Sequence, residues 1–428
     1  MLSIRRPIVT IAFALVAVAI VTLVAVSRAQ AGYPGKIGVI AVDSDFGGLS
    51  DDEIFTMPNT GGPPFTQLTF NVLGNVQNDD DPAYSGDGKK IVWEGDTDGP
   101  AGGDDEIFIM NSDGSGQTQL TPTSNPGFWE EDPAISWDGK RIVWECEDPD
   151  NEICVMNSDG SGRVQLTNDT DVSESDPVFS RDGTKIYYES DADDQANFNS
   201  EIWVMNADGT GQHQVTAAPG FSDDPDVSPD DRRVVFTSDR ADQVDFTIDI
   251  WIMNADGSEQ TKLTSLSSGS FADRPVWSPD GKRIAFDYSP STGDDQILVI
   301  NADGSGLAPL TTTPGESVDS PDWQPIPVFC GGQMATLVGT DGPDDMVGTA
   351  GADVIAGLAG KDTLSGLGGK DILCGGGGKD LLKGGNGNDR LFGQAGKDKL
   401  KGGKGKKDRC VGGKGDDSAK GCEKTKSI

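Results

Sequence analysis

The sequence predicts an all-β protein with a six-bladed β-propeller plus a C-terminal parallel β-roll. One sequence motif, whose clearest copy contains NADGSG, occurs six times. Its copies begin at Met57, Met110, Met156, Met205, Met253 and Ile300, so the steps between them are 53, 46, 49, 48 and 47 residues. A period in the forties that contains several short strands indicates propeller blades. From Gly339 the chain changes to glycine-rich nonapeptides, which are typical of a coil of short parallel strands.

Each blade repeat divides into four predicted strands. In the cleanest copy, from Arg274 to Thr311, these are RPVW, KRIAFD, QILVIN and APLT. The turn SPDG joins the first two strands, because Pro, Asp and Gly supply the dihedral angles of a tight turn. The second strand alternates apolar residues of the β-branched and aromatic kinds. Four antiparallel strands in each of six units make a six-bladed propeller.

The two ends of the array complete each other. The first unit begins at Gly35–Asp43 and lacks a first strand, whereas the last ends at Ser320–Pro325, which is a first strand without a second. Pairing these segments would close the ring and cover two exposed sheet edges.

The phrases SPDG and MNADGSG make this region, residues 36–324, similar to the TolB-type propellers, a WD-like repeat family. The resemblance implies a scaffold fold on which many functions have been placed. TolB itself carries an α/β domain ahead of its propeller, whereas these blades directly follow an expected export segment. A TolB-like component of the periplasm or cell envelope is therefore the alternative function and not the first expectation.

Residues 1–31 predict an export signal. Arg5 and Arg6 precede an apolar run from Ile8 to Val26, and Ala29-Gln30-Ala31 fits a cleavage site. The run is also long enough for an uncleaved membrane anchor, which is the alternative. The expected domains are therefore a signal or anchor at 1–31, the propeller at 32–324, a hinge at 325–338, the roll at 339–420 and a tail at 421–428.

The net charge of -36 is unevenly placed, since residues 330–428 hold 16 Lys or Arg against 13 Asp or Glu. An anionic propeller repels phosphate, so nucleic acid is not an expected partner. The acids gather in the loops that follow the second and fourth strands of each blade, and these loops share one rim of the disc. This acidic rim is either a docking face for cations or for a protein or glycan, or a solvated surface that keeps the protein soluble.

Nine registers between Gly339 and Lys420 fit the pattern G-G-x-G-x-D-x-U-x, in which U is apolar. They resemble the repeats-in-toxin (RTX) or hemolysin-type calcium-binding family. The resemblance implies two nonapeptides per turn of a parallel β-roll, with Ca²⁺ held between repeats two apart by carbonyl groups and by the aspartate at position six. The expected ligands form one ladder of Asp344, Asp362, Asp380, Asp398 and Asp417 and another of Asp353, Asp371, Asp389 and Asp408. The expected inward residues are Met346, Ile355, Leu364, Leu373, Leu382, Leu391 and Leu400.

Without the ion we expect the roll to be poorly folded, because glycine has a large ordering entropy and stacked carboxylates repel one another. Ion binding then supplies folding energy. The alternative interpretation of a glycine-rich segment is a flexible linker. Lysines at position five (Lys361, Lys370, Lys379 and Lys397) are expected to weaken calcium affinity, and the last two repeats to bind poorly or to act as a cap.

Six cysteines in an exported chain predict three disulfides. Cys146 and Cys154 flank a short loop and make a natural hairpin staple. Cys410 and Cys422 flank the last repeat, which leaves Cys330 and Cys374 to fix the hinge to the roll.

The composition favours a binding protein over an enzyme. His213 is the only histidine, and no G-x-S-x-G motif is present, so the usual general base and nucleophile are missing. A carboxylate-dependent hydrolase is the minor alternative. We expect a non-enzymatic, calcium-binding protein that is secreted, at the cell surface or in the periplasm, and that contacts a membrane only if residues 1–31 stay uncleaved.

Overall fold

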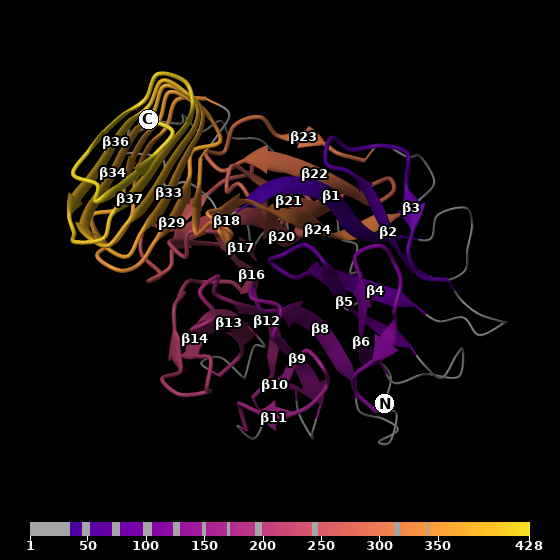
Figure 1. Ribbon diagram of the computed structural model, residues 1–428. Coiled ribbons are helices and arrows are strands. Elements are labelled where there is room, and N and C mark those ends of the chain that lie inside the picture. Colours follow the sequence, from indigo (N-terminus) through magenta and orange to yellow (C-terminus); the bar gives the residue numbers. More distant parts are fainter. Residues whose placement is uncertain are drawn as a thin grey trace.

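The computed structural model describes residues 35–44, 52–70, 78–96, 105–122, 129–147, 151–168, 172–192, 199–241, 247–311, 317–339 and 342–428, and the regular elements of these residues are all strands. They form a propeller of six sheets and a coil of parallel strands (Figure 1). This confirms the expected all-β fold with a propeller and a roll. The expected export segment lies outside the described residues, and within the described part of the chain no helix is long and apolar enough to span a membrane.

Each blade has four antiparallel strands, named here from the axis outwards. The first blade is β24 (Val318–Pro327), β1 (Gly35–Ser44), β2 (Glu53–Pro58) and β3 (Thr66–Gln67). The second is β4 (Asp79–Tyr84), β5 (Lys90–Asp96), β6 (Asp105–Asn111) and β7 (Thr118–Gln119). The third is β8 (Glu130–Ile135), β9 (Arg141–Glu147), β10 (Asn151–Asn157) and β11 (Val164–Gln165).

The remaining three blades repeat this order. The fourth is β12 (Glu174–Phe179), β13 (Lys185–Ser190), β14 (Glu201–Asn206) and β15 (His213–Gln214). The fifth is β16 (Ser222–Val227), β17 (Arg233–Ser238), β18 (Asp249–Asn254) and β19 (Thr261–Lys262). The sixth is β20 (Phe271–Trp277), β21 (Arg283–Ser289), β22 (Gln296–Asn301) and β23 (Ala308–Pro309).

The ring closes through the pairing that the incomplete end units predict. β24 runs antiparallel to β1, with Val318 opposite Ser44 at one end and Pro327 opposite Gly35 at the other. The closing strand therefore continues three residues past the expected propeller boundary at residue 324. Neither β1 nor the inner side of the first blade is left as an open edge.

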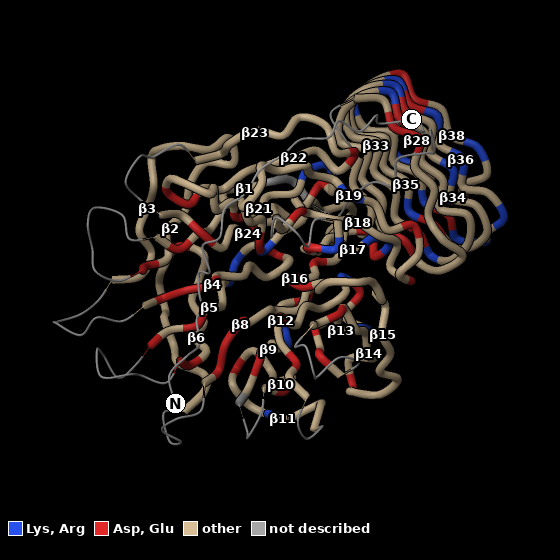
Figure 2. Tube along the Cα trace, turned by 180° about the vertical axis from the view of Figure 1, so that it is seen from behind, with Lys and Arg blue, Asp and Glu red and all other residues tan. Residues whose placement is uncertain are grey.

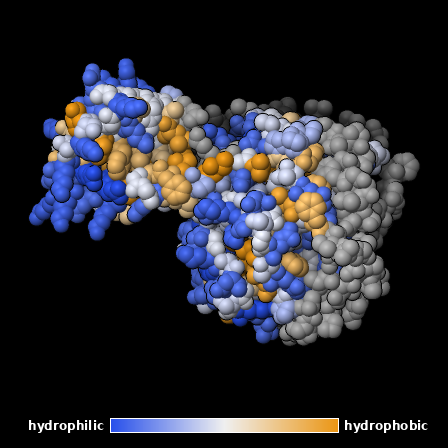
Figure 3. All heavy atoms as spheres, turned by 45° about the vertical axis from the view of Figure 1, so that its right-hand side comes forward, coloured by the Kyte–Doolittle hydropathy of each residue, from blue (hydrophilic) through white to orange (hydrophobic). Residues whose placement is uncertain are grey.

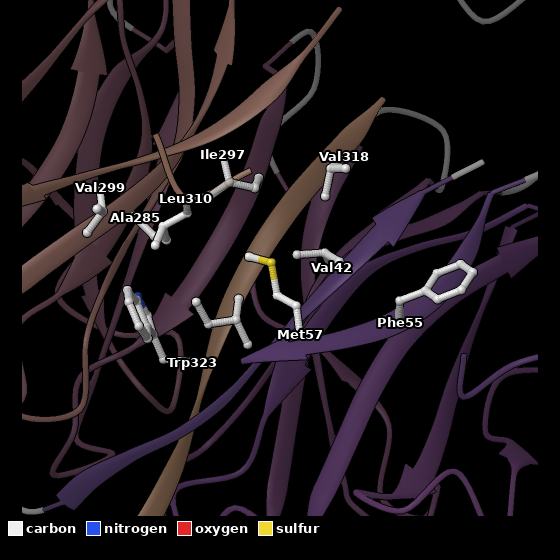
Figure 4. Close-up of a cluster of buried hydrophobic side chains, with 10 residues drawn as sticks. Val42, Phe55, Met57, Ala285, Ile297, Val299, Leu310, Val318 and Trp323 are labelled. Atoms are coloured by element: carbon white, nitrogen blue, oxygen red, sulfur yellow. The ribbon is translucent and has the colours of Figure 1, made fainter. Parts of the chain in front are cut away.

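Apolar side chains pack between neighbouring blades and hold the ring together. The cluster at the closing seam joins the first and sixth blades (Figure 4) and consists of Ile40, Val42, Phe55, Met57, Ala285, Ile297, Val299, Leu310, Val318 and Trp323. Trp323 is 1% exposed and comes from the closing strand itself. Burying a side chain of this size is a large part of what keeps the last strand in the first blade.

The roll contains two parallel sheets with neighbouring rungs about two nonapeptides apart. One, here called the linker-side sheet, pairs β27 (Leu337–Val338), β29 (Val354–Ala356), β33 (Ile372–Gly378), β35 (Arg390–Gly396), β37 (Arg409–Lys414) and β39 (Lys424–Lys426), and the short β30 (Ala359–Gly360) also pairs with β33. The other, here called the outer sheet, pairs β28 (Asp345–Val347), β31 (Thr363–Ser365), β34 (Leu381–Gly387), β36 (Lys399–Lys404) and β38 (Ser418–Lys420), and β32 (Gly368–Gly369) also pairs with β34.

The apolar residue at position eight of each nonapeptide lies between the two sheets. All seven expected inward residues, from Met346 to Leu400, are at most 1% exposed and form one cluster with Cys410. The periodicity of the sequence therefore identified the interior of the roll correctly.

The segment expected as a hinge, residues 325–338, is instead built into the fold. After β24 it forms the hairpin of β25 (Phe329–Cys330) and β26 (Gln333–Met334), which packs on the linker-side sheet. Ala335 and Val338 are buried there against Ala356 and Ile372. The expected tail, residues 421–428, likewise contains β39, the last rung of that sheet.

All three disulfides that the sequence favours are present, joining Cys146 to Cys154, Cys330 to Cys374 and Cys410 to Cys422. The second fixes the linker hairpin to β33. The third ties the end of the roll to β37.

Replacing Trp323 by alanine should destabilise the propeller by about 3–5 kcal/mol, because the substitution leaves a large cavity at the closing seam. Every tryptophan of the chain lies between Trp93 and Trp323, so tryptophan fluorescence during urea unfolding reports on the propeller alone. Phe70→Ala is the control, since Phe70 is 62% exposed and its loss should change stability by less than about 0.5 kcal/mol. Equal effects of the two substitutions would contradict this role of the seam.

Candidate functional site

The turns of the roll bring successive rungs closer than any side chain allows. Gly378 and Gly396 have φ angles of 140° and 137°. A Cβ atom on either would lie 1.5 Å from the carbonyl oxygen of the glycine one rung earlier. Only glycine fits at such a contact, so the glycines set the spacing at which the turns stack.

The position-six aspartates are joined rung to rung by hydrogen bonds. The backbone N–H of Asp362 donates to Oδ1 of Asp380 (2.9 Å), and the N–H of Asp380 donates to Oδ1 of Asp398 (3.0 Å). The same bond links the pairs Asp344–Asp362, Asp353–Asp371, Asp371–Asp389, Asp389–Asp408 and Asp398–Asp417. The structure thus places all nine expected residues in two ladders, one along each edge of the roll.

One end of a ladder is closed by a residue that the repeat pattern does not contain. The backbone N–H of Asp408 donates to Oε2 of Glu423 at 2.6 Å. Glu423 takes the position that a further aspartate would occupy. It follows Cys422 outside any nonapeptide register, so the sequence offered no signal for it.

The second carboxylate oxygen of most ladder residues has no hydrogen-bond partner. Among the described residues this holds for the buried Oδ2 atoms of Asp362, Asp371, Asp380, Asp389, Asp398, Asp408 and Asp417. A buried anionic oxygen without a donor is costly. Asp408 and Asp417 share this feature, although their repeats were expected to bind calcium poorly.

A backbone carbonyl oxygen lies close to each of these Oδ2 atoms, which we call the orphan oxygens. A Cβ atom on Gly357 would lie 2.6 Å from both Asp362 Oδ2 and the carbonyl oxygen of Gly375. The same arrangement occurs at Gly393, with Asp398 Oδ2 at 2.5 Å and the Gly412 carbonyl oxygen at 2.6 Å. Carboxylate and carbonyl oxygens are the ligands that Ca²⁺ prefers, so these residues fit that ion.

The first repeats differ from the central ones. Oδ2 of Asp353 accepts the backbone N–H of Thr349 at 2.7 Å, and the Thr349 hydroxyl lies 3.2 Å away. The protein itself therefore satisfies this oxygen. Nothing in the nonapeptide pattern distinguished Asp353 from the aspartates that follow it.

The lysines at position five are exposed and contribute their backbone to the roll. The N–H of Lys397 donates to the carbonyl oxygen of Gly378 at 3.1 Å. Their side chains take no part in the ladders. This fits the expectation that lysine is tolerated at that position, and its effect on affinity stays a prediction.

Burial makes the ladder carboxylates hard to ionise when no cation is bound. It raises the pKa of Asp362 to about 7 and that of Asp371 to about 6, and carboxylates on adjacent rungs add to the effect. Burial also raises the pKa values of Asp380, Asp389 and Asp398. A cation between the rungs would remove the cause of these shifts.

A second group of polar residues surrounds the propeller axis. The innermost strand of each blade has a bulge, and the residue before its proline has a φ of 48° to 50°. These six residues line a central channel with a volume of about 190 Å³ and are Asp81, Asp132, Asp176, Asp224, Arg274 and Ser320. The second strand of each blade places another residue just behind them, namely Asp43, Glu94, Glu145, Glu189, Thr237 and Asp287.

We call these twelve residues the channel mouth. Nine are carboxylates and Arg274 is the one base among them. Arg274 binds Asp81 through two nitrogens, with Nε 3.0 Å from Oδ1 and Nη2 3.1 Å from Oδ2. Oxygens of Asp81, Glu94 and Asp132 lie within 4.8 Å of one another, but because Arg274 already neutralises Asp81, this group alone does not indicate a metal ion.

The channel mouth is rich in carboxylates, and its buried position opposes their ionisation. Burial, with adjacent carboxylates, raises the pKa values of Asp132, Asp176 and Glu189 well above the usual range, and raises that of the neighbouring Asp80 to about 8. Asp80, Asp132 and Asp176 lie near the beginning of β4, β8 and β12, at the end of each strand where the sequence places the acidic rim. The longer acidic loops, at 45–51, 97–104, 148–150, 193–198 and 242–246, lie outside the described residues.

His213 lies away from both sites. It is exposed on β15, and its Nδ1 is 2.9 Å from the carbonyl oxygen of Gly211 in its own turn.

Comparisons with known proteins agree with the two halves of the chain. The profile of the RTX calcium-binding nonapeptide repeat matches residues 338–373 and 375–406. No curated protein sequence matches the chain. TolB from Acinetobacter baumannii has a TM-score of 0.57 at 18% identity over 68% of this chain and 68% of its own. Hydrazine synthase from Kuenenia stuttgartiensis has a TM-score of 0.53 at 17% identity over 69% of this chain and 47% of its own.

Identity this low shows the fold alone. The chain therefore carries RTX calcium-binding repeats at its C-terminus, behind a propeller of TolB-like fold.

In chelator, the stability of the roll should rise as the pH falls from about 8 to about 5. The folded-state pKa values of Asp362 and Asp371 are raised above the unfolded value near 3.9, so the folded state binds more protons in this range. Hydrogen exchange of amides in residues 342–426 measures the effect. Millimolar Ca²⁺ should remove the pH dependence, and a metal-free roll that loses stability on acidification would contradict the prediction.

Asp176→Asn should stabilise the propeller at pH 8 by about 1 kcal/mol, because it removes a carboxylate whose ionisation burial and neighbouring charges oppose. The gain should vanish in acid, where Asp176 is protonated. Asn also tolerates the positive φ of this position. The control is Asp113→Asn, which should destabilise, since hydrogen bonds from Ser115 lower the pKa of exposed Asp113. Urea unfolding at both pH values, followed by tryptophan fluorescence, distinguishes the two.

Proposed function

We propose that this is an exported, non-enzymatic calcium-binding protein whose RTX repeats become ordered around Ca²⁺ and whose propeller binds a partner at the channel mouth. The observation that carries the proposal is the series of orphan Oδ2 atoms, each beside a backbone carbonyl oxygen. Bound Ca²⁺ would compensate these oxygens, and its binding energy would add to the folding energy of the roll. The residues proposed to hold it are the ladder aspartates from Asp362 to Asp417.

Three disulfides support a location outside the cytoplasm, because such bonds persist in oxidising compartments. The concentration of free calcium is also higher outside cells than in the cytoplasm. Weak calcium sites of the extracellular type would stay empty in the cytoplasm. With the predicted export signal, these features favour a protein that is secreted, at the cell surface or in the periplasm.

The channel mouth is proposed as the binding face of the propeller. A cationic group that enters this concave site would favour the ionised form of its nine carboxylates, so the site suits a cationic partner. Because these carboxylates repel one another, the mouth costs stability that a purely structural role does not need. A basic protein segment suits the site better than a neutral glycan, which would leave the charges uncompensated.

The likeness of the propeller to TolB supports a second candidate, an envelope component in which the roll is incidental. The orphan oxygens count against it, since an incidental tail has no reason to keep seven equivalent carboxylates in register.

Asp380→Asn in the full chain should weaken calcium binding by about tenfold or more, because even changes behind a metal's own ligands cost about 10- to 100-fold in affinity. The measurement is the calcium concentration that half-protects the amides of residues 342–426 from hydrogen exchange. Asp416→Asn is the matched control, because Asp416 is exposed and outside both ladders. Equal half-protecting calcium concentrations for the two variants, or no calcium-dependent protection in the wild type, would contradict the proposal.

A further inference from the structure

One exposed face of the roll carries a row of lysines. Lys383 pairs with Lys401, and Lys401 pairs with Lys420, on the adjacent parallel strands β34, β36 and β38. Lys399 lies two residues from Lys401 on the same side of β36. We call these four residues the lysine face. Neighbouring strands are about 4.8 Å apart, so these lysines lie next to one another on one surface of the outer sheet.

The lysine face is not needed to build the outer sheet. The same row begins with Val347 and Ser365 on β28 and β31, so its strands form without lysine. Like charges directly opposite one another destabilise a sheet. Within the described residues no carboxylate forms an ion pair with any of the four lysines. An uncompensated row of this kind suits an anionic partner.

The molecule itself presents a carboxylate-rich surface, the channel mouth, whose groups would ionise more readily beside a cation. Figure 2 shows Lys and Arg concentrated on the roll and Asp and Glu prevailing over the propeller strands. The two charged surfaces are thus carried by different halves of one chain.

The lysine face is kept away from the channel mouth of its own chain. β24 begins beside the mouth, where Asp319 pairs with Asp43, and runs to Pro327 at the opposite rim. At about 3.3 Å per residue this strand spans about 30 Å. The roll therefore starts on the far side of the disc.

The linker also fixes which way the roll turns. The Cys330–Cys374 disulfide joins the linker hairpin to β33, and Nη2 of Arg390 donates to the carbonyl oxygen of Gly331 at 3.0 Å. The linker-side sheet consequently lies nearest the propeller, and β34 and β36 lie on the side away from it (Figure 1). Figure 3 shows apolar atoms where the roll meets the propeller and hydrophilic ones on its outer side.

We propose that the lysine face of one copy docks on the channel mouth of a second copy, so that the chains associate head to tail. The charges are complementary between copies, and the linker holds the two surfaces of one copy apart. Two different surfaces make the interface, so a bound pair still has one free surface of each kind. Such a heterologous contact builds open chains unless the rotation happens to close a ring.

Calcium would regulate this contact. Nine of the 13 acidic residues between 330 and 428 are ladder aspartates, and bound Ca²⁺ would offset their negative charge. Association should therefore strengthen with calcium and weaken with salt, which screens exposed charges. This regulation rests on the proposed calcium binding, whereas the complementarity of the two surfaces does not.

Sedimentation velocity of the full chain tests the proposal, using a roll variant (K383E, K401E and K420E together) and a mouth variant (D132N and D176N together). At low salt with millimolar Ca²⁺, the wild type should form species larger than a dimer. Each variant alone should stay monomeric. Their equimolar mixture should stop at a dimer, because one intact mouth meets one intact lysine face.

Asn keeps the positive φ that Asp132 and Asp176 adopt, and the hydrogen-exchange protection of residues 342–426 in Ca²⁺ verifies that the roll variant folds. One outcome would overturn the inference and leave the proposed function intact. In it, Ca²⁺ protects the roll amides of the wild type from hydrogen exchange, but the wild type stays monomeric at every salt concentration. Loss of calcium protection in the wild type would instead overturn the proposed function. Calcium-dependent retention of a monomeric wild type on immobilised alginate, lost in the roll variant, would overturn self-association in favour of an anionic polysaccharide.

Discussion

The roll depends on a bond between the backbone of one aspartate and the side chain of the aspartate one rung further on. That bond fixes one carboxylate oxygen and leaves the other buried without a donor. Oδ1 of Asp380 accepts the N–H of Asp362, and Oδ1 of Asp389 accepts the N–H of Asp371, whereas Oδ2 of each has no donor. In the part of the chain that the structure describes, no lysine or arginine forms an ion pair with these aspartates, and the position-five lysines are exposed. The repeat therefore stacks well and is electrostatically incomplete, and a divalent cation is the simplest group that completes it.

The two halves of the chain obtain stability in different ways. The propeller closes on itself through β24 and β1 and buries large side chains such as Trp323 and Met57 between blades. The roll buries one modest apolar residue per nonapeptide and relies on glycine turns. We expect the propeller to fold without an ion and the roll to need one, which would offset its repulsion and its ordering entropy. A protein built this way can carry a permanent binding surface and an ion-dependent one in a single chain.

Much of this architecture was predictable from the sequence because it repeats. The period of the blades gave their number, the incomplete end units gave the closing pair, and the nonapeptide register identified Leu364 and Leu382 as interior residues. What the sequence could not supply were features that occur once. Glu423 closes a ladder from outside the repeat, and Thr349 satisfies the oxygen of Asp353.

The expected hinge shows the same limit. Its apolar residues pack against Ile372 and Ala356, which occupy outward positions of the repeat and were not expected to be covered. The channel mouth was visible only as a count of acidic residues. The arrangement of these residues depends on the closed ring, because the ring brings Arg274 into contact with Asp81. The ring also places a second row of carboxylates behind the first.

The central claim is that calcium sits between rungs, next to the orphan oxygens of the ladder. The most direct measurement is a crystal structure of the chain grown in Ca²⁺, with anomalous differences used to locate the ion. The account predicts peaks beside Oδ2 of Asp362, Asp380 and Asp398, each also near a glycine carbonyl oxygen. An ordered roll with the same ladders and no anomalous peak would contradict it.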